Sequence, residues 1–311
     1  MISASASAKI ILCGEHAVVY QQPAIAVPVS ALRATASAAP ASALSFWLED
    51  LDQTPFDLTA SSPIAELGRL VCKTLKIEPP AFAIRVKSEI PIASGLGSGA
   101  AISTAVTRLL FRLAGQPPDL KQINALVYEA EKLYHGTPSG IDNTVIVYEQ
   151  PVYFVREQPL ELIRIARPMR FVIADTGIKA PTRISVGDVR HLVETQTDRI
   201  QPVLDAIGTL TRQVRQSLEV GDAALLGTLM NANHSHLQTL TVSSPELDRL
   251  VEAARGAGAL GAKLSGGGRG GNMMALVTEK SVEAVKQALN RAGAVRVFDM
   301  TLEATQDDNA R

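Results

Sequence analysis

Cysteine is scarce in this chain, because only Cys13 and Cys72 occur among its 311 residues. Two thiols cannot build a disulfide framework or a four-cysteine zinc site. Both also lie in apolar runs, where a small buried side chain is expected. We therefore expect a reducing, cytoplasmic localisation.

Neither sign of charge is in excess, and long hydrophobic runs are missing. Lys and Arg total 30 against 31 Asp and Glu, so no net field is available to hold a polyanion and nucleic acid is not an expected partner. Arg108 and Arg112 interrupt the best apolar run, and none reaches the ~18 residues needed to span a bilayer. The first residues lack the basic segment of a secretory signal. We expect no membrane association.

Aromatic residues make up only 4%, whereas 22 glycines gather in a few clusters. With 46% hydrophobic and 20% charged residues, the composition is that of a folded globular chain. At about 150 residues per domain, the length suggests two domains or one large one. We place two domains, at residues 1–168 and 169–311. Strand-like runs come first, and helical and strand patterns alternate afterwards. This order predicts an α+β fold with mixed sheets.

Local patterns predict the individual elements. Helices are expected at 64–75, 100–113, 119–135, 185–240 with breaks near Gly208 and Gly221, 245–255 and 281–292. Strands are expected at 9–13, 24–29, 32–38, 44–48, 82–89, 145–155, 162–166, 171–174, 261–265, 273–277 and 295–302.

The segment PIASGLGSGAA, residues 91–101, lies between a predicted strand and a predicted helix. Free amides at such a helix N-terminus form an anion site, usually for phosphate. The alternative is a glycine-rich turn with Ser98 as an ordinary N-cap. The glycines of 256–261 and 266–271 match G-x-G-x-x-G in number, but neither set joins a strand to a following helix. A dinucleotide fingerprint and a Walker A loop are therefore poor interpretations.

Glu131 and Asp142 stand eleven residues apart, at the end of a predicted helix and just after it. Pro138 and Gly140 stop the helix, so a tight turn can bring Asp142 back toward Glu131. Two such carboxylates can hold magnesium beside a phosphate, or orient and deprotonate an alcohol. Either could instead be an ordinary solvated carboxylate.

Lys9 is the only cation within a strongly apolar strand. It could be exposed at a strand edge, or it could face a carboxylate and stabilise charge on an attacking oxygen. The five histidines, by contrast, show no spacing typical of a metal site with cysteine.

Taken together, these motifs resemble the GHMP family of small-molecule kinases. The resemblance rests on KIILCGEHAVVY at 9–20, PIASGLGSGAA at 91–101, HGTPSGIDN at 135–143 and KLSGGGRGG at 263–271, in family order. Within the family, GEHAVVY is most similar to the mevalonate kinases. The resemblance implies a two-domain α+β architecture with mixed sheets and an active site in the cleft between the domains.

The resemblance also implies ATP and Mg²⁺ and assigns roles to single residues. Asp142 would be the catalytic carboxylate facing the substrate hydroxyl, and Lys9 would pair with it. Glu131 and Ser98 would hold magnesium. The implied nucleotide-binding residues are Pro91, Ser94, Gly95, Leu96, Gly97, Ser98, Gly99 and Ala100. The implied substrate-binding residues are Glu15, His16, Ser139, Gly140 and Thr182.

Two departures from the family pattern bear on the chemistry of the site, whereas Ser7-Ala8 in place of the usual Pro-Gly affects mainly the start of the strand. Gly99 stands where a serine is usual as the magnesium ligand, so Ser98, water or Glu131 with the phosphates would replace that hydroxyl. Arg269 stands where glycine is usual, so its loop could differ in conformation, or its guanidinium could reach a phosphate.

The function implied is transfer of the ATP γ-phosphate to the 5-hydroxyl of mevalonate. One alternative is a GHMP enzyme acting on a phosphorylated mevalonate or another small alcohol. Another is a catalytically silent ligand sensor. A homodimer is compatible with the sequence.

Overall fold

The computed structural model describes residues 2–51, 54–91, 94–135 and 138–305, which pack as two units. The first unit comprises 1–9, 28–92 and 96–150, and the second comprises 10–27, 93–95 and 151–311. This division differs from the expected boundary after residue 168. One reason is that the strand pairing of 152–154 is with residues 24–26 at the start of β2, which also belong to the second unit.

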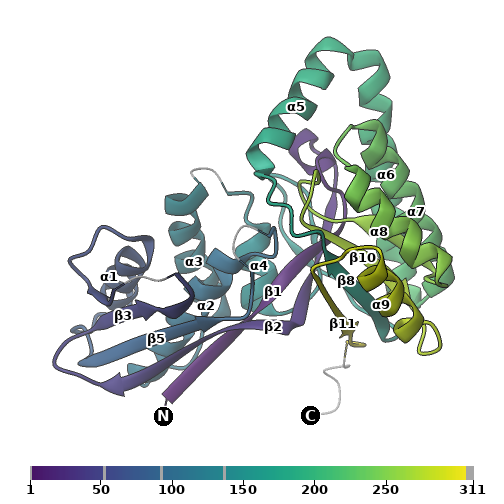
Figure 1. Ribbon diagram of the computed structural model, residues 1–311. Coiled ribbons are helices and arrows are strands. Elements are labelled where there is room, and N and C mark those ends of the chain that lie inside the picture. Colours follow the sequence, from purple (N-terminus) through teal and green to yellow (C-terminus); the bar gives the residue numbers. More distant parts are fainter. Residues whose placement is uncertain (1, 52–53, 92–93, 136–137, 306–311) are drawn as a thin grey trace. The chain divides into compact units, whose positions relative to one another are not determined.

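The first unit is a mixed sheet with helices packed along it (Figure 1). Its strands are paired in the order β4-β3-β5-β2, with β1 also pairing with β2. The β3–β5 pair is parallel, and the β2–β5 and β3–β4 pairs are antiparallel. These strands are β1 (Ile2–Cys13), β2 (Ala24–Pro40), β3 (Ser45–Leu48), β4 (Phe56–Asp57) and β5 (Phe82–Ser88). The helices are α1 (Pro63–Leu75), α2 (Ser98–Leu113), α3 (Leu120–His135) and α4 (Ile141–Tyr148).

Local signals explain α1 and α2. At α1, the Ser62 side chain accepts a hydrogen bond from the backbone N–H of Ala65, and Pro63 occupies the first turn. Both features favour a helix start. Helix α2 is buried over most of its length, and its small residues Ala100, Ala101 and Ala105 allow neighbouring elements to approach closely. Helix α2 accordingly contacts α1, α3 and α4.

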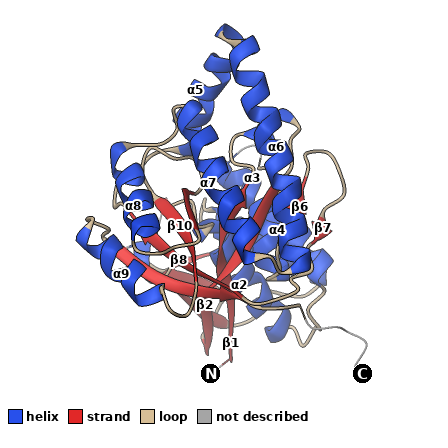
Figure 2. Ribbon diagram, turned by 90° about the vertical axis from the view of Figure 1, so that its right-hand side faces the viewer, coloured by secondary structure: helices blue, strands red, loops and turns tan. Residues whose placement is uncertain are grey.

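The second unit contains a four-stranded antiparallel sheet in the order β11-β8-β10-β9. In Figure 2, α8 and α9 lie beside this sheet, while α5 and α6 extend away from it as a pair. The sheet strands are β8 (Met169–Asp175), β9 (Gly261–Leu264), β10 (Asn272–Val277) and β11 (Arg296–Leu302). The helices are α5 (Thr182–Thr195), α6 (Thr197–Val220), α7 (Ala223–Thr239), α8 (Pro245–Gly256) and α9 (Val282–Arg291). Strands β6 (Val152–Phe154) and β7 (Glu161–Leu162) pair with each other, and Ala17–Tyr20 form the 3₁₀ helix η1.

The prediction of a strand at 145–155 is wrong, because residues 141–148 form α4 and the strand is restricted to 152–154. Val145, Ile146 and Val147 are all buried, in a helix that packs against α2 and α3. Burial on several sides outweighs the β preference of branched residues. Asp142 consequently lies in the first turn of a helix and not in a tight turn. The predicted strand at 162–166 is also shorter than expected, because β7 covers only Glu161–Leu162.

The predicted break at Gly208 is also wrong, because α6 runs through it without interruption. Gly208 makes room for a neighbouring side chain: a Cβ atom there would lie 2.6 Å from Cδ of Gln22. The glycine therefore serves packing. The predicted break at Gly221 is confirmed, since this residue has a left-handed conformation and ends the helix.

Gly227 is needed where α7 touches β9. A Cβ atom on Gly227 would overlap the backbone oxygen of Leu260, and no side-chain rotation can relieve this overlap. We expect Gly227→Ala to lower the free energy of unfolding by about 1–3 kcal/mol. The matched control is Gly187→Ala in α5, where no atom lies within 4 Å. It should raise stability by up to ~1 kcal/mol. Denaturant unfolding of both variants tests this, and equal stabilities would contradict it.

Candidate active site

Lys9 and Asp142 form an ion pair in the first unit. Lys9 Nζ on β1 lies 2.9 Å from Asp142 Oδ1, with the lysine side chain 6% and the aspartate 33% exposed. Asp142 lies in the first turn of α4, which starts after Gly140 in a left-handed conformation. A mostly buried lysine therefore faces a carboxylate that retains access to solvent.

The helix that carries Asp142 is anchored at both ends. Near its start, Asn143 Nδ2 donates to Asn124 Oδ1 on α3 at 2.7 Å. At its end, the Glu149 carboxylate accepts hydrogen bonds from Arg33 at 2.9 Å and Arg108 at 2.7 Å. These partly buried, charge-assisted contacts restrict how α4 can move. The position of Asp142 is thus set by α2, α3 and β2.

Glu131 on α3 is only 2% exposed. Burial, together with the nearby Asp142 carboxylate, raises the pKa of Glu131 to about 7, while Lys9 acts in the opposite direction. Such a shift means that negative charge is costly here in the absence of a further cation. The described residues place Lys9, Glu131 and Asp142 in one electrostatic cluster.

The glycine-rich loop that precedes α2 packs against Lys9. Leu96 O accepts the backbone N–H of Lys9 at 3.0 Å. Gly97, with φ 75°, is the N-cap of α2, and a Cβ atom there would lie 3.0 Å from Lys9 Cγ and 2.9 Å from Ile146 Cδ1. Only glycine combines this conformation with this contact. The N-terminus of α2, with Ser98, Gly99 and Ala100 in its first turn, therefore belongs to the same site as the ion pair.

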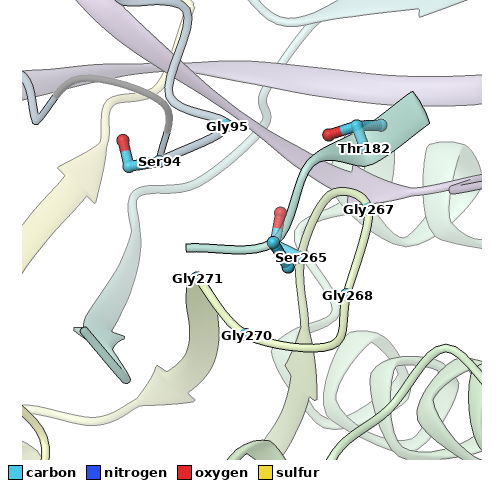
Figure 3. A pocket seen from close by; sticks show the side chains of 9 residues that line it. Ser94, Gly95, Thr182, Ser265, Gly267, Gly268, Gly270 and Gly271 are labelled. Atoms are coloured by element: carbon cyan, nitrogen blue, oxygen red, sulfur yellow. The ribbon is translucent and has the colours of Figure 1, made fainter. Parts of the chain in front are cut away.

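A second group of predicted residues lines a pocket within the second unit (Figure 3). Its lining residues are Ser94, Gly95, Ala180, Thr182, Ser265, Gly267, Gly268, Gly270 and Gly271. Gly267 packs against the start of α5, because a Cβ atom there would lie 2.9 Å from Thr182 Oγ1. The structure thus brings Ser94 and Gly95 of the first glycine-rich loop to one pocket with Thr182 and the last glycine motif. Pro91 is partly buried, and residues 92–93 of its motif lie outside the described part of the chain.

The remaining predicted substrate residues fall into two places. Ser139 and Gly140 directly precede α4 in the first unit, and Ser139 Oγ accepts the backbone N–H of Ile141 at 3.3 Å. In the second unit, the ring of His16 donates from Nε2 to the oxygen of Gly267 at 3.1 Å. Burial lowers the pKa of His16. Glu15 is almost wholly buried and holds Lys263 and Asn233.

Sequence reasoning assigned no role to Lys263 or Asn233. Lys263 could have been found by the same pattern as Lys9, because it too is a single cation in a short apolar strand. Asn233 carries no such signal, because a polar residue within a helical pattern is usually solvated. Its burial depends on how α7 packs against β9.

Arg269 has a left-handed conformation with φ 60°, and its guanidinium pairs with Asp188 on α5. Its backbone N–H donates to Val242 O at 2.7 Å. The loop thus keeps a backbone conformation that favours glycine. The guanidinium pairs with the Asp188 carboxylate, a contact that neither alternative for this arginine included.

Few side chains are available to hold a metal ion. Within the described ranges, no group of three histidine, cysteine, aspartate or glutamate side chains has suitable geometry. The buried Glu131 carboxyl beside Asp142 is nevertheless suited to a divalent cation, which would offset two adjacent negative charges. Mg²⁺ often takes only one or two protein carboxylates and completes its shell with phosphate and water. The residues present therefore fit Mg²⁺ bound together with a nucleotide.

No helix in the described part of the chain is both long and apolar enough to cross a membrane.

Comparison with known proteins identifies related sequences and structures. The profile of the GHMP kinases N terminal domain matches residues 64–150, and that of the GHMP kinases C terminal matches residues 214–295. A mevalonate kinase of Thermococcus sibiricus is 34% identical over 95% of each chain. A mevalonate kinase of Pyrococcus furiosus is 33% identical, covering 94% of this chain and 93% of that protein.

Solved structures agree with these matches. The crystal structure of L. major mevalonate kinase in complex with R-mevalonate superimposes with a TM-score of 0.85 and 28% identity, covering 98% of this chain and 97% of that one. The crystal structure of Methanococcus jannaschii mevalonate kinase superimposes with a TM-score of 0.86 and 25% sequence identity, covering 98% of both chains. The α+β fold expected from the sequence is confirmed, with one mixed sheet and one antiparallel sheet. This chain belongs to the GHMP kinase family.

Proposed function

We propose that this kinase transfers the γ-phosphoryl group of ATP to the 5-hydroxyl of mevalonate in the presence of Mg²⁺. The observation that carries the proposal is the Lys9–Asp142 pair, whose lysine lies against Gly97 at the start of α2. Relatives named mevalonate kinase over nearly the full chain support the choice of acceptor. The free cysteines fit action in the cytoplasm.

Positioning and charge neutralisation would supply most of the rate enhancement, as is general for phosphoryl transfer. Asp142 would accept a hydrogen bond from the acceptor hydroxyl and take its proton as the oxygen attacks phosphorus. The Lys9 ammonium would stabilise negative charge developing on that oxygen. The amides at the start of α2 would hold phosphate oxygens. Transfer would be direct and in line, without a phosphorylated enzyme.

Glu131 and the Ser98 hydroxyl would hold Mg²⁺. When bound, the ion would neutralise charge on the β- and γ-phosphates. Gly99 has no side chain to act as a ligand, so the ion would rely on Glu131 more strongly than in relatives with a serine at this position.

The remaining predicted residues would bind the two substrates. The nucleotide would contact Pro91 and the loop 94–100. The acceptor would contact His16, Thr182, Ser139 and Gly140. Glu15 would lie nearby, with its carboxylate already engaged by protein groups.

A coupled assay of ADP release tests the proposal with mevalonate, phosphomevalonate, galactose and homoserine as acceptors. We expect mevalonate to give the highest kcat/KM and the other three to give little turnover. A higher kcat/KM with phosphomevalonate would assign a neighbouring reaction instead. Binding of ATP without turnover of any acceptor would favour a sensor.

Glu131→Gln should weaken Mg²⁺ dependence specifically. Removing the charge of this buried carboxyl is expected to raise the Mg²⁺ concentration for half-maximal activity about 10-fold to 100-fold. Glu129→Gln is the matched control, since Glu129 is exposed on the same helix and pairs with Lys132. Activity is measured against Mg²⁺ at fixed ATP. Identical Mg²⁺ curves for the two variants would exclude Glu131 as a ligand.

A further inference from the structure

The most deeply buried ion pair recorded in the described residues joins two motifs that are far apart in the sequence. Lys263 on β9 is 0% exposed, and Glu15, in the turn after β1, is 1% exposed. The two side chains contact each other through Nζ and Oε1. Both residues belong to the second unit. The first and last motifs of the chain are therefore linked by charge in the protein interior.

The charged atoms of this pair also form hydrogen bonds with other protein groups. Asn233 Nδ2, on α7, donates to the other carboxylate oxygen of Glu15 at 3.1 Å. Lys263 Nζ also donates to Leu264 O at 2.6 Å. Because both carboxylate oxygens already have partners and the side chain is buried, Glu15 is poorly placed to contact a ligand directly.

Two further hydrogen bonds join the segment around Glu15 to the segment around Lys263. His16, which follows Glu15 directly, donates from Nε2 to the backbone oxygen of Gly267 at 3.1 Å. Gly267 lies shortly after Lys263 in the sequence. Ser265 Oγ donates to Ile11 O at 2.7 Å. Ser265 and Gly267 line the pocket that also contains Thr182. The segments that carry the ion pair therefore also carry or hold residues that line this pocket.

His16 also has an unfavourable backbone conformation, with φ 61°. A non-glycine residue with positive φ costs of order 1 kcal/mol or more and persists only where its surroundings enforce it. Glu15 is its immediate neighbour and is held by Lys263. The pair is thus in a position to enforce the conformation of His16.

A buried ion pair is a poor means of gaining stability, because desolvation offsets much of its attraction. Apolar or neutral side chains of similar volume are often equally stable in such places. We propose that Glu15 and Lys263 are positioning residues: together they hold His16 and the Gly267 loop in the geometry that binds the acceptor, and Glu15 makes no contact with the acceptor itself. This inference rests on the proposed function.

The double variant Glu15→Gln/Lys263→Met tests the proposal, because it removes both charges and leaves neither buried alone. We expect its melting temperature to stay within about 5 °C of the parent value. The KM for mevalonate should rise about 10-fold or more, while kcat and the KM for ATP change less than about 3-fold. Each single variant should melt well below the parent, since it strands one buried charge.

The matched control is Arg170→Met/Asp299→Asn, which removes a cross-strand ion pair between β8 and β11 in the same unit. It should leave both KM values unchanged. A parental KM for mevalonate in the folded Glu15/Lys263 double variant would overturn the proposal, and so would equal changes in both KM values. Either result would mean that the pair does not position the groups that bind the acceptor.

Should the double variant fail to fold, Asn233→Ala supplies the second test. This change removes one hydrogen bond to Glu15 while keeping the ion pair. It should raise the KM for mevalonate about 2-fold to 5-fold, and no change would count against positioning. The acceptor assay on the parent protein separates the two proposals. If another acceptor is preferred, the proposed function fails, and the KM of that acceptor then tests the positioning role.

Discussion

Asp142→Asn is expected to lower kcat about 10²-fold to 10⁴-fold, the usual contribution of a general base. The amide has nearly the same shape but can neither take the hydroxyl proton nor carry charge opposite Lys9. Because α4 remains anchored through Asn143 and Glu149, folding and ATP binding should be retained. Steady-state kinetics, nucleotide titration and a melting curve measure the three quantities.

The control for this variant is Asp119→Asn at the start of α3. Asp119 accepts the backbone N–H groups of Lys121 and Gln122, a capping role that asparagine fills equally well. Its kinetics should match the parent. If Asp142→Asn turned over mevalonate at a rate close to that of this control, the carboxylate would have no catalytic role.

Lys9→Met should reduce kcat about 10²-fold to 10³-fold, the typical effect of removing one group that stabilises charge in a transition state. Methionine fills the space of the buried lysine stem beside Gly97. The variant would also leave Glu131 and Asp142 without their nearby cation. Repulsion between these carboxylates should then make activity depend more steeply on Mg²⁺. Rates measured over a range of Mg²⁺ concentrations test both effects.

Lys87→Met is the matched substitution for this test, because Lys87 is an exposed residue on strand β5 of the same unit. It should change kcat less than about 2-fold, as surface substitutions usually do. A similar small effect of Lys9→Met would show that the ion pair serves only to hold β1 against α4.

Some elements of the fold follow from local sequence signals alone, and others do not. Helix α1 could be predicted because Ser62 and Pro63 mark its start within the chain itself. Helix α4 could not, because Val145, Ile146 and Val147 favour a strand by local preference. Their burial against α2 and α3 selects the helix.

The candidate site shows the same division. The residues alone left open whether Lys9 was an exposed lysine or a partner of a carboxylate, and the family resemblance favoured Asp142. Glu15 was expected near the acceptor from the motif in which it stands. Its engagement with Lys263 and Asn233 depends on segments more than 200 positions away, and no local pattern reports such contacts.

The sequence by itself determined the family, the α+β class and the positions of the glycine-rich loops. Motif order and local signals are properties of the linear chain. Tertiary structure decided which charges meet: Lys9 with Asp142, Glu15 with Lys263, and Arg269 with Asp188. Such pairings depend on the packing of helices and strands around buried side chains. Burial and the neighbouring charge also shift the pKa of Glu131, and both exist only after the chain has folded.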